Sequence, residues 1–173
     1  MNTLELIKQS YARQLGAAMK TVKECITLAN SDTWISKILV YPYWQICYHI
    51  TFYTDFYFSI NRKAFKPAGF HFNGLNCLEG DIHPVLKDHG MEILSKEQVL
   101  ESFESARKSI KKYLDTMSEE YLTAESPFGW HGFPVIDIID YNIRHNHHHA
   151  GQLALNLRAV QDTPLPWIMR AEI

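Results

Sequence analysis

Hydrophobic residues recur with a helical period in four long stretches of this chain, separated by segments rich in polar residues, glycine and proline. The pattern predicts four main helices, over residues 3–29, 43–64, 95–117 and 135–161. Only TWISKILV, residues 33–40, has the composition of a short strand. We therefore expect an all-α protein, an up-down four-helix bundle with long crossing loops. No repeat or long linker divides the chain, so the expectation is a single domain over residues 1–173.

The expected helix over residues 43–64 differs from the others because it is apolar on nearly every side. A helix of this kind is either central in a bundle or shared with another subunit. Gln45, His49 and Asp55 interrupt its apolar positions within one span, so we do not expect it to cross a membrane.

Two expected loops frame the remaining helices. Residues 66–90 are rich in Gly, Pro, Asn and His, and loops of that length in compact domains tend to be functional or mobile. The helix after this loop opens with Ser95-x-x-Gln98, the pattern of a capping box. The second loop, residues 126–134, contains Trp130 and His131, which we take as candidate pocket walls because the segment is aromatic. Simple packing over the bundle end is an equally good interpretation of both loops.

Composition narrows the possible partners. A chain of 173 residues with 46% hydrophobic residues can bury a core, and 17 Lys and Arg against 19 Asp and Glu leave a net charge of −2. That balance argues against a nucleic-acid partner, whose phosphates require clustered cations. Three dispersed cysteines favour reduced thiols and a cytoplasmic location. Glu5 and Lys8 interrupt the first apolar positions, so no secretory leader is expected there.

Histidine is the unusual residue: the chain has nine, and four of them lie within residues 145–149. On a helical wheel at about 100° per residue, His145 and His149 lie about 40° apart, on the side of the apolar positions. Asn142 and Gln152 share that side, His148 lies at its boundary, and His147 points to water.

Two histidines one turn apart on an inward face can bind a single metal ion as neutral imidazoles. The alternative is a histidine-rich exposed helix, or core histidines hydrogen-bonded to their neighbours. His49 is the one further histidine inside an expected helix, and it is surrounded by apolar positions; in isolation it is a hydrogen-bonded core residue. Gln152, Asn142 and Tyr53 each lie one turn from a histidine, where they can orient an imidazole or act as simple polar satisfiers.

The two histidine segments together carry a resemblance to a known family. An apolar helix with one histidine (YWQICYHITFY), followed later by H-x-x-x-H-x-G-Q (HNHHHAGQ), resembles the DinB-like (YfiT-like) four-helix-bundle superfamily. The resemblance covers essentially the whole chain. It implies a divalent metal, zinc or nickel, on His49, His145 and His149 near one end of the bundle. Ala150 stands where the family often has arginine, so no anion contact from that position is carried over.

The resemblance also implies a class of activity and an assembly. Characterised relatives include thiol S-transferases that use low-molecular-weight thiols as cosubstrates, and members commonly form homodimers. We therefore expect a metal-dependent enzyme that activates a thiol or water for transfer or hydrolysis on a small molecule. The alternative is a non-catalytic, dimeric metal-bearing protein that binds a ligand or partner. Proteolysis of the zincin type is disfavoured, because Asn146 stands where that motif requires glutamate.

Overall fold

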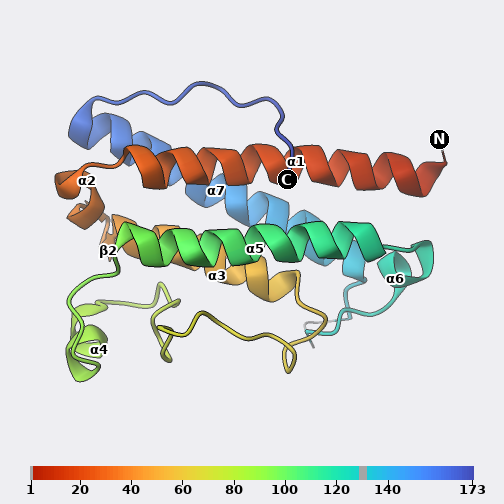
Figure 1. The fold of residues 1–173 in the computed structure, drawn as a ribbon, viewed down its shortest axis with the longest axis horizontal. Coiled ribbons are helices and arrows are strands. Elements are labelled where there is room, and N and C mark those ends of the chain that lie inside the picture. Colours follow the sequence, from red (N-terminus) through yellow and green to blue (C-terminus); the bar gives the residue numbers. More distant parts are fainter. Residues whose placement is uncertain (1, 129–131) are drawn as a thin grey trace.

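Four long helices pack into a bundle in the computed structural model, which describes residues 2–128 and 132–173 (Figure 1). They are α1 (Thr3–Leu28), α3 (Tyr43–Tyr57), α5 (Lys96–Thr116) and α7 (Val135–Gln161). The closest packing joins α1 to α7, α7 to α3, α3 to α5 and α5 to α1, so each long helix has two main neighbours. The expectation of an all-α bundle is confirmed.

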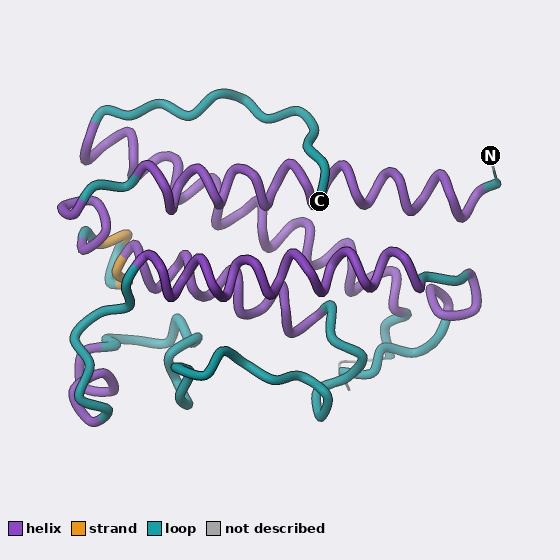
Figure 2. The backbone as a smooth tube through the Cα atoms, in the orientation of Figure 1, coloured by secondary structure: helices purple, strands orange, loops and turns teal. Residues whose placement is uncertain are grey.

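The direction of the helices follows from one long crossing. Figures 1 and 2 show α1 and α3 running in opposite directions, whereas α3 and α5 run the same way. Residues 58–95 make this possible, because they return along the bundle before α5 begins. The predicted up-down order is therefore wrong for this pair of helices, and the long crossing is the reason. The predicted loop 66–90 lies within this crossing and contains one short helix, α4 (His83–Asp88).

The predicted strand over residues 33–40 is largely wrong. Its first residues belong to a short helix, α2 (Ser31–Ile35), because the Asn30 side chain caps the helix by accepting from the Thr33 amide at 2.8 Å. Within residues 33–40, only β1 (Lys37–Ile38) is a strand. It pairs antiparallel with β2 (Tyr41–Pro42), which follows the predicted range. A further short helix, α6 (Glu119–Thr123), lies between α5 and α7 and had no clear sequence signal.

The second long helix ends earlier than predicted: α3 stops at Tyr57, whereas the pattern extended it to residue 64. The side chains after Tyr57 bond to the backbone in a turn. Ser59 Oγ donates to the Phe56 carbonyl at 2.7 Å, and Asn61 Oδ1 accepts from the amides of Lys63 and Ala64. Such local side-chain bonds compete with helical ones, so the apolar pattern overstated the helix.

The other predicted boundaries agree with the structure. Ser95 and Gln98 form the predicted capping box at the start of α5, with each side chain bonded to the other residue's backbone amide. The last helix, α7, spans residues 135–161 as predicted and ends where Asp162 adopts a left-handed conformation, with φ of 50°. Proline precedes this helix and follows it, at Pro134 and Pro164.

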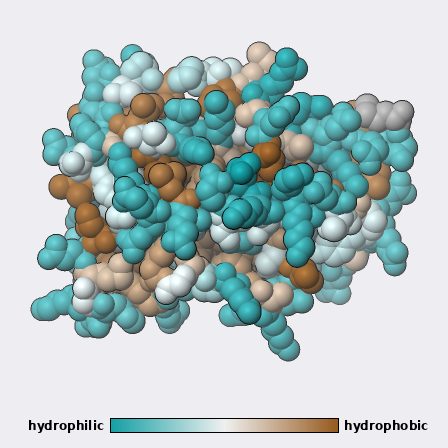
Figure 3. Space-filling view, in the orientation of Figure 1, coloured by the Kyte–Doolittle hydropathy of each residue, from teal (hydrophilic) through white to brown (hydrophobic). Residues whose placement is uncertain are grey.

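Most of α3 is buried within the chain, which supports its interpretation as a central helix. Trp44, Tyr48 and Ile50 are among its fully buried side chains. The surface seen in Figure 3 is mostly hydrophilic, with separate hydrophobic areas. No helix in the described part of the chain is both long and apolar enough to span a bilayer.

After α7, the C-terminal segment returns along the bundle and ends beside the middle of α1 (Figure 1). Gly16 of α1 makes this approach possible, since a Cβ atom at that position would lie 2.0 Å from the Ala171 carbonyl oxygen. On the same segment, Trp167 and Met169 remain largely exposed.

Candidate metal centre

Three histidines from two neighbouring helices meet on one side of α3. His49 extends from α3, and His145 and His149 extend from α7, one turn apart. One ring nitrogen from each histidine lies within 4.8 Å of the other two. The Nε2 atoms of His49 and His145 are 2.9 Å apart, and the His149 ring centroid is 4.9 Å from that of His49. The structure thus brings together the three residues that the sequence analysis combined.

The two histidines of α7 lie at the edge of its buried face and not at its centre. Ile138, Asn142 and Leu153 are buried, and the buried residues of α7 centre at about 90° from His145 on the wheel. His145 and His149 are therefore half-buried, as is His49. An edge position leaves one side of the histidine cluster toward solvent.

Two hydrogen bonds orient the imidazoles. His49 Nδ1–H donates to the backbone carbonyl of Asn76 at 2.8 Å, and His149 Nδ1–H donates to Gln152 Oε1 at the same distance. Each neutral ring then carries its lone pair on Nε2. This is the usual arrangement of a metal-ligating histidine, in which the distal N–H is held by an oxygen acceptor.

The donor set fits a divalent transition metal. Because His49 keeps its proton on Nδ1, the contact between the two Nε2 atoms is a hydrogen bond from His145 to His49. His145 Nδ1 is buried and has no partner in the described part of the chain, so the His145 proton can move there and free a third lone pair. Nitrogens that bind one ion at about 2.1 Å lie roughly 3.0–3.4 Å apart, close to the 2.9 Å observed.

Burial keeps these imidazoles neutral. It lowers the pKa of His49 to about 4, and the smaller effect of the bond to the Asn76 carbonyl acts in the opposite direction. Burial, reinforced by the neighbouring His49 and His149, lowers the pKa of His145 to about 3. The pKa of His149 is also lowered by burial. Near neutral pH all three rings are therefore unprotonated at one nitrogen, as metal binding requires.

Aromatic rings cover part of the cluster. Tyr53 packs against His49 with ring centroids 4.8 Å apart, and its hydroxyl accepts from Asn76 Nδ2 at 3.1 Å. Tyr141 stacks on His145 with ring centroids 6.0 Å apart. Sequence reasoning missed two of these neighbours. Tyr141 lies one turn before His145 and was detectable on the wheel, whereas the Asn76 carbonyl had no side-chain signal.

The other predicted site residues have different surroundings. Asn142 accepts from Asn146 Nδ2 at 2.7 Å, and no hydrogen bond joins it to an imidazole among the described residues. His148 is exposed and accepts from Gln152 Nε2 at 3.2 Å, so Gln152 bridges His148 and His149. Trp130 and His131 lie outside the described residues.

The histidine cluster has three possible protein ligands among the described residues. In residues 2–128 and 132–173, no Cys, Asp, Glu or further His joins the three histidines within ligand distance. Structural zinc sites are usually closed by four protein ligands, whereas catalytic sites keep three and an exchangeable position. The described residues thus supply three possible protein ligands at a half-buried edge.

Comparison with known proteins agrees with the geometry. A family model described as DinB superfamily matches residues 19–153, a range that covers most of the chain and all three histidines. Searches of curated proteins and of solved structures gave no significant match.

Proposed function

The chain belongs to the DinB superfamily, and from this premise we propose that it is a metal-dependent enzyme acting on a small molecule. His49, His145 and His149 hold the metal ion in this proposal, with zinc or nickel as the expected metal. The reaction is transfer or hydrolysis, with a thiol or water as the nucleophile.

The convergence of three neutral imidazoles at the edge of the bundle carries this proposal. Neutral ligands leave the full charge of a divalent ion uncompensated, and such an ion lowers the pKa of a bound water or thiol toward neutral. The missing fourth protein ligand, within the described part of the chain, supports an open position for that group.

The protein's own residues contribute orientation and shielding. The Asn76 carbonyl and Gln152 hold the outer nitrogens of His49 and His149, so both rings present Nε2 to the same point. The rings of Tyr53 and Tyr141 pack against His49 and His145, respectively, and shield these imidazoles in part. The Tyr53 hydroxyl, held by Asn76, lies near the cluster as a polar group that a substrate can contact.

A low-molecular-weight thiol is the nucleophile that we favour. The support is the superfamily membership together with the soft character of zinc and nickel toward sulfur. A homodimer belongs to the same proposal, although α3 offers it little surface because most of that helix is buried within one chain. Light scattering of the purified protein tests the dimer directly.

The experiment begins with metal analysis of protein purified without nickel resin. A panel of thiols is then supplied with a reactive electrophile, and product is measured before and after chelation. We expect turnover that is lost on chelation and restored by zinc or nickel. Turnover that persists unchanged after chelation would contradict metal dependence, and bound metal without turnover would favour a non-catalytic binding protein.

A further inference from the structure

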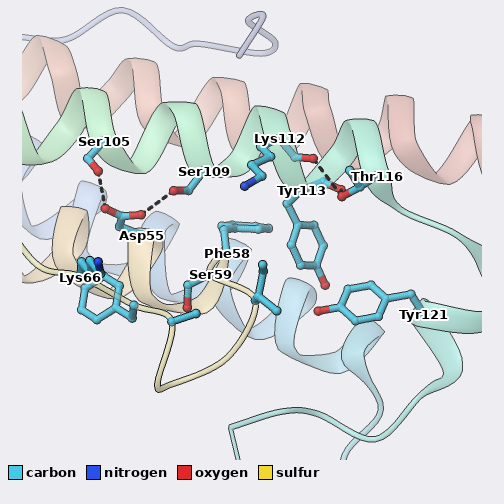
Figure 4. Close-up of a pocket in the computed structure, with 13 residues that line it drawn as sticks. Asp55, Phe58, Ser59, Lys66, Ser105, Ser109, Lys112, Tyr113, Thr116 and Tyr121 are labelled. Carbon is cyan, nitrogen blue, oxygen red and sulfur yellow. Dashed lines mark hydrogen bonds between the residues drawn. The ribbon is translucent and has the colours of Figure 1, made fainter.

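A cavity with a volume of about 520 Å³ lies on a different side of α3 from the histidines (Figure 4). Its walls come from the end of α3, the chain segment that follows, α5 and α6. Asp55 of this cavity lies about 240° from His49 around the helix. None of the three histidines lines the cavity, so it is a separate site.

Asp55 provides a fixed negative charge at one end of the cavity. Its two carboxylate oxygens accept from Ser105 Oγ and Ser109 Oγ, both at 2.6 Å (Figure 4). No Lys, Arg or His among the described residues lies within ion-pair distance of it. A carboxylate has about four acceptor positions, so two remain for an external donor.

Two exposed lysines also line the cavity with this carboxylate. Lys66 and Lys112 both line it, and neither forms an ion pair with a described residue. A simple cation entering the cavity meets two like charges, and a simple anion meets Asp55. A ligand that carries both charges can bind groups of both signs, because its ammonium can bind Asp55 and its anion can bind a lysine.

The remaining wall is aromatic. Phe58 is buried, and its ring packs edge-on against Tyr113 with centroids 5.1 Å apart. The ring centroids of Tyr121 and Tyr113 are 5.6 Å apart, and Figure 4 shows the two hydroxyl groups pointing toward one another. This wall offers an apolar surface with two hydroxyls at its end.

We propose that this cavity binds a small zwitterion with an apolar side chain, namely an apolar or aromatic α-amino acid. Asp55 receives the α-ammonium group, one of the two lysines, Lys66 or Lys112, receives the carboxylate, and the side chain packs on Phe58 and Tyr113. The volume falls within the range of about 300–1,000 Å³ that is typical of small-molecule sites. The inference does not depend on the metal centre, since the two sites share no residue.

Calorimetric titration with matched probes tests the charge pattern. L-phenylalanine is the full ligand, phenethylamine lacks its carboxylate, 3-phenylpropionate lacks its ammonium, and L-alanine lacks its ring. We expect saturable binding of L-phenylalanine to the intact protein and at least about 10-fold weaker binding of each reduced probe, because two of them lose a charged hydrogen bond and L-alanine loses the buried ring. Absence of saturable L-phenylalanine binding would overturn the proposal.

Variants then locate the binding. Asp55→Asn and the double change Lys66→Gln/Lys112→Gln should each weaken L-phenylalanine binding at least about 10-fold. Lys108→Gln is the matched control, because Lys108 is exposed on the same helix and outside the cavity; it should bind as the intact protein does. Circular dichroism confirms that each variant folds, and the metal content of each variant should equal that of the intact protein. Undiminished binding by folded Asp55→Asn would place the ligand elsewhere and refute the assignment.

Discussion

Polar groups lie on two sides of the mainly hydrophobic helix α3, and the two sides differ in the charge of these groups. On the side of His49 the polar groups are neutral, because burial lowers the pKa values of the imidazoles. On the side of Asp55 the groups belong to residue types that are charged, and the carboxylate is held by two serine hydroxyls.

The difference indicates what each side can bind. Neutral nitrogen donors that converge within 4.8 Å suit a cation, which supplies the charge that the protein lacks there. Dispersed charges of both signs around an aromatic wall suit a ligand with matching charges of its own. One helix can thus serve two chemically unrelated sites because different faces of it contact different neighbours, α7 and α5.

The change expected to have the largest effect removes one ligand from the histidine side. His145→Ala should lower the metal content of purified protein to near background, because two imidazoles hold an ion far more weakly than three. It should also lower the melting temperature of the metal-loaded protein only, since metal binding stabilises the folded state. Elemental analysis and calorimetry measure these effects.

His147→Ala is the control for this change, because His147 is exposed on the same helix. It should keep the metal content and melting temperature of the unmodified protein. Equal melting shifts of His145→Ala with and without metal would instead make His145 a packing residue.

A smaller effect is expected from the residue that orients His149. Gln152→Ala removes the acceptor for His149 Nδ1–H and should weaken metal affinity by roughly 10–100-fold. Competition with a chromophoric chelator measures the affinity. Arg158→Ala on the same helix is exposed and should have no effect, and a Gln152→Ala protein with unchanged affinity would show that the bond does not orient the ligand.

Acid should destabilise the metal-free protein through the histidine side. An unfolded histidine binds a proton near pH 6.5, whereas His49 in the folded protein does so only near pH 4. The unfolded state therefore binds more protons in this window, and the free energy of unfolding should rise with pH from about 4 to about 6.5. Urea titrations across these pH values measure the slope, which His49→Gln should reduce. An equal slope in that variant would assign the effect to other groups.

The smallest effect is expected on the Asp55 side. Ser105→Ala removes one hydrogen bond to the carboxylate at an exposed position, and should cost about 1 kcal/mol or less of the free energy of unfolding. Metal content should stay unchanged, since the two sides share no residue. Urea denaturation gives the first quantity and elemental analysis the second; a loss of metal would show that the two faces of α3 are coupled.

The helices were largely predictable from the sequence because their signals are local. The Ser95–Gln98 capping box and the prolines around α7 lie within the segments they delimit. The prediction was wrong at the end of α3, where the turn-forming bonds of Ser59 and Asn61 outweigh a continuing apolar pattern.

The site was predictable to a smaller extent. The spacing of His145 and His149 selected two of the three residues that meet, whereas His49 was added to them by the resemblance to the family, because its position alone favoured a hydrogen-bonded core residue. Their half-buried position was not predicted, because it depends on how α7 is rotated against α3. The cavity at Asp55 could not be foreseen either, since Ser105 and Ser109 reach that carboxylate from another helix.

The acceptor that orients His49 is a main-chain oxygen, and this has a consequence for protein engineering. Every amino acid carries a carbonyl, so exchanging the residue at position 76 leaves the acceptor in place as long as the backbone keeps its path. Inserting or deleting residues between α3 and α5 shifts that path and removes the acceptor. Loop length, more than loop composition, is therefore the property that a redesign of this crossing has to preserve.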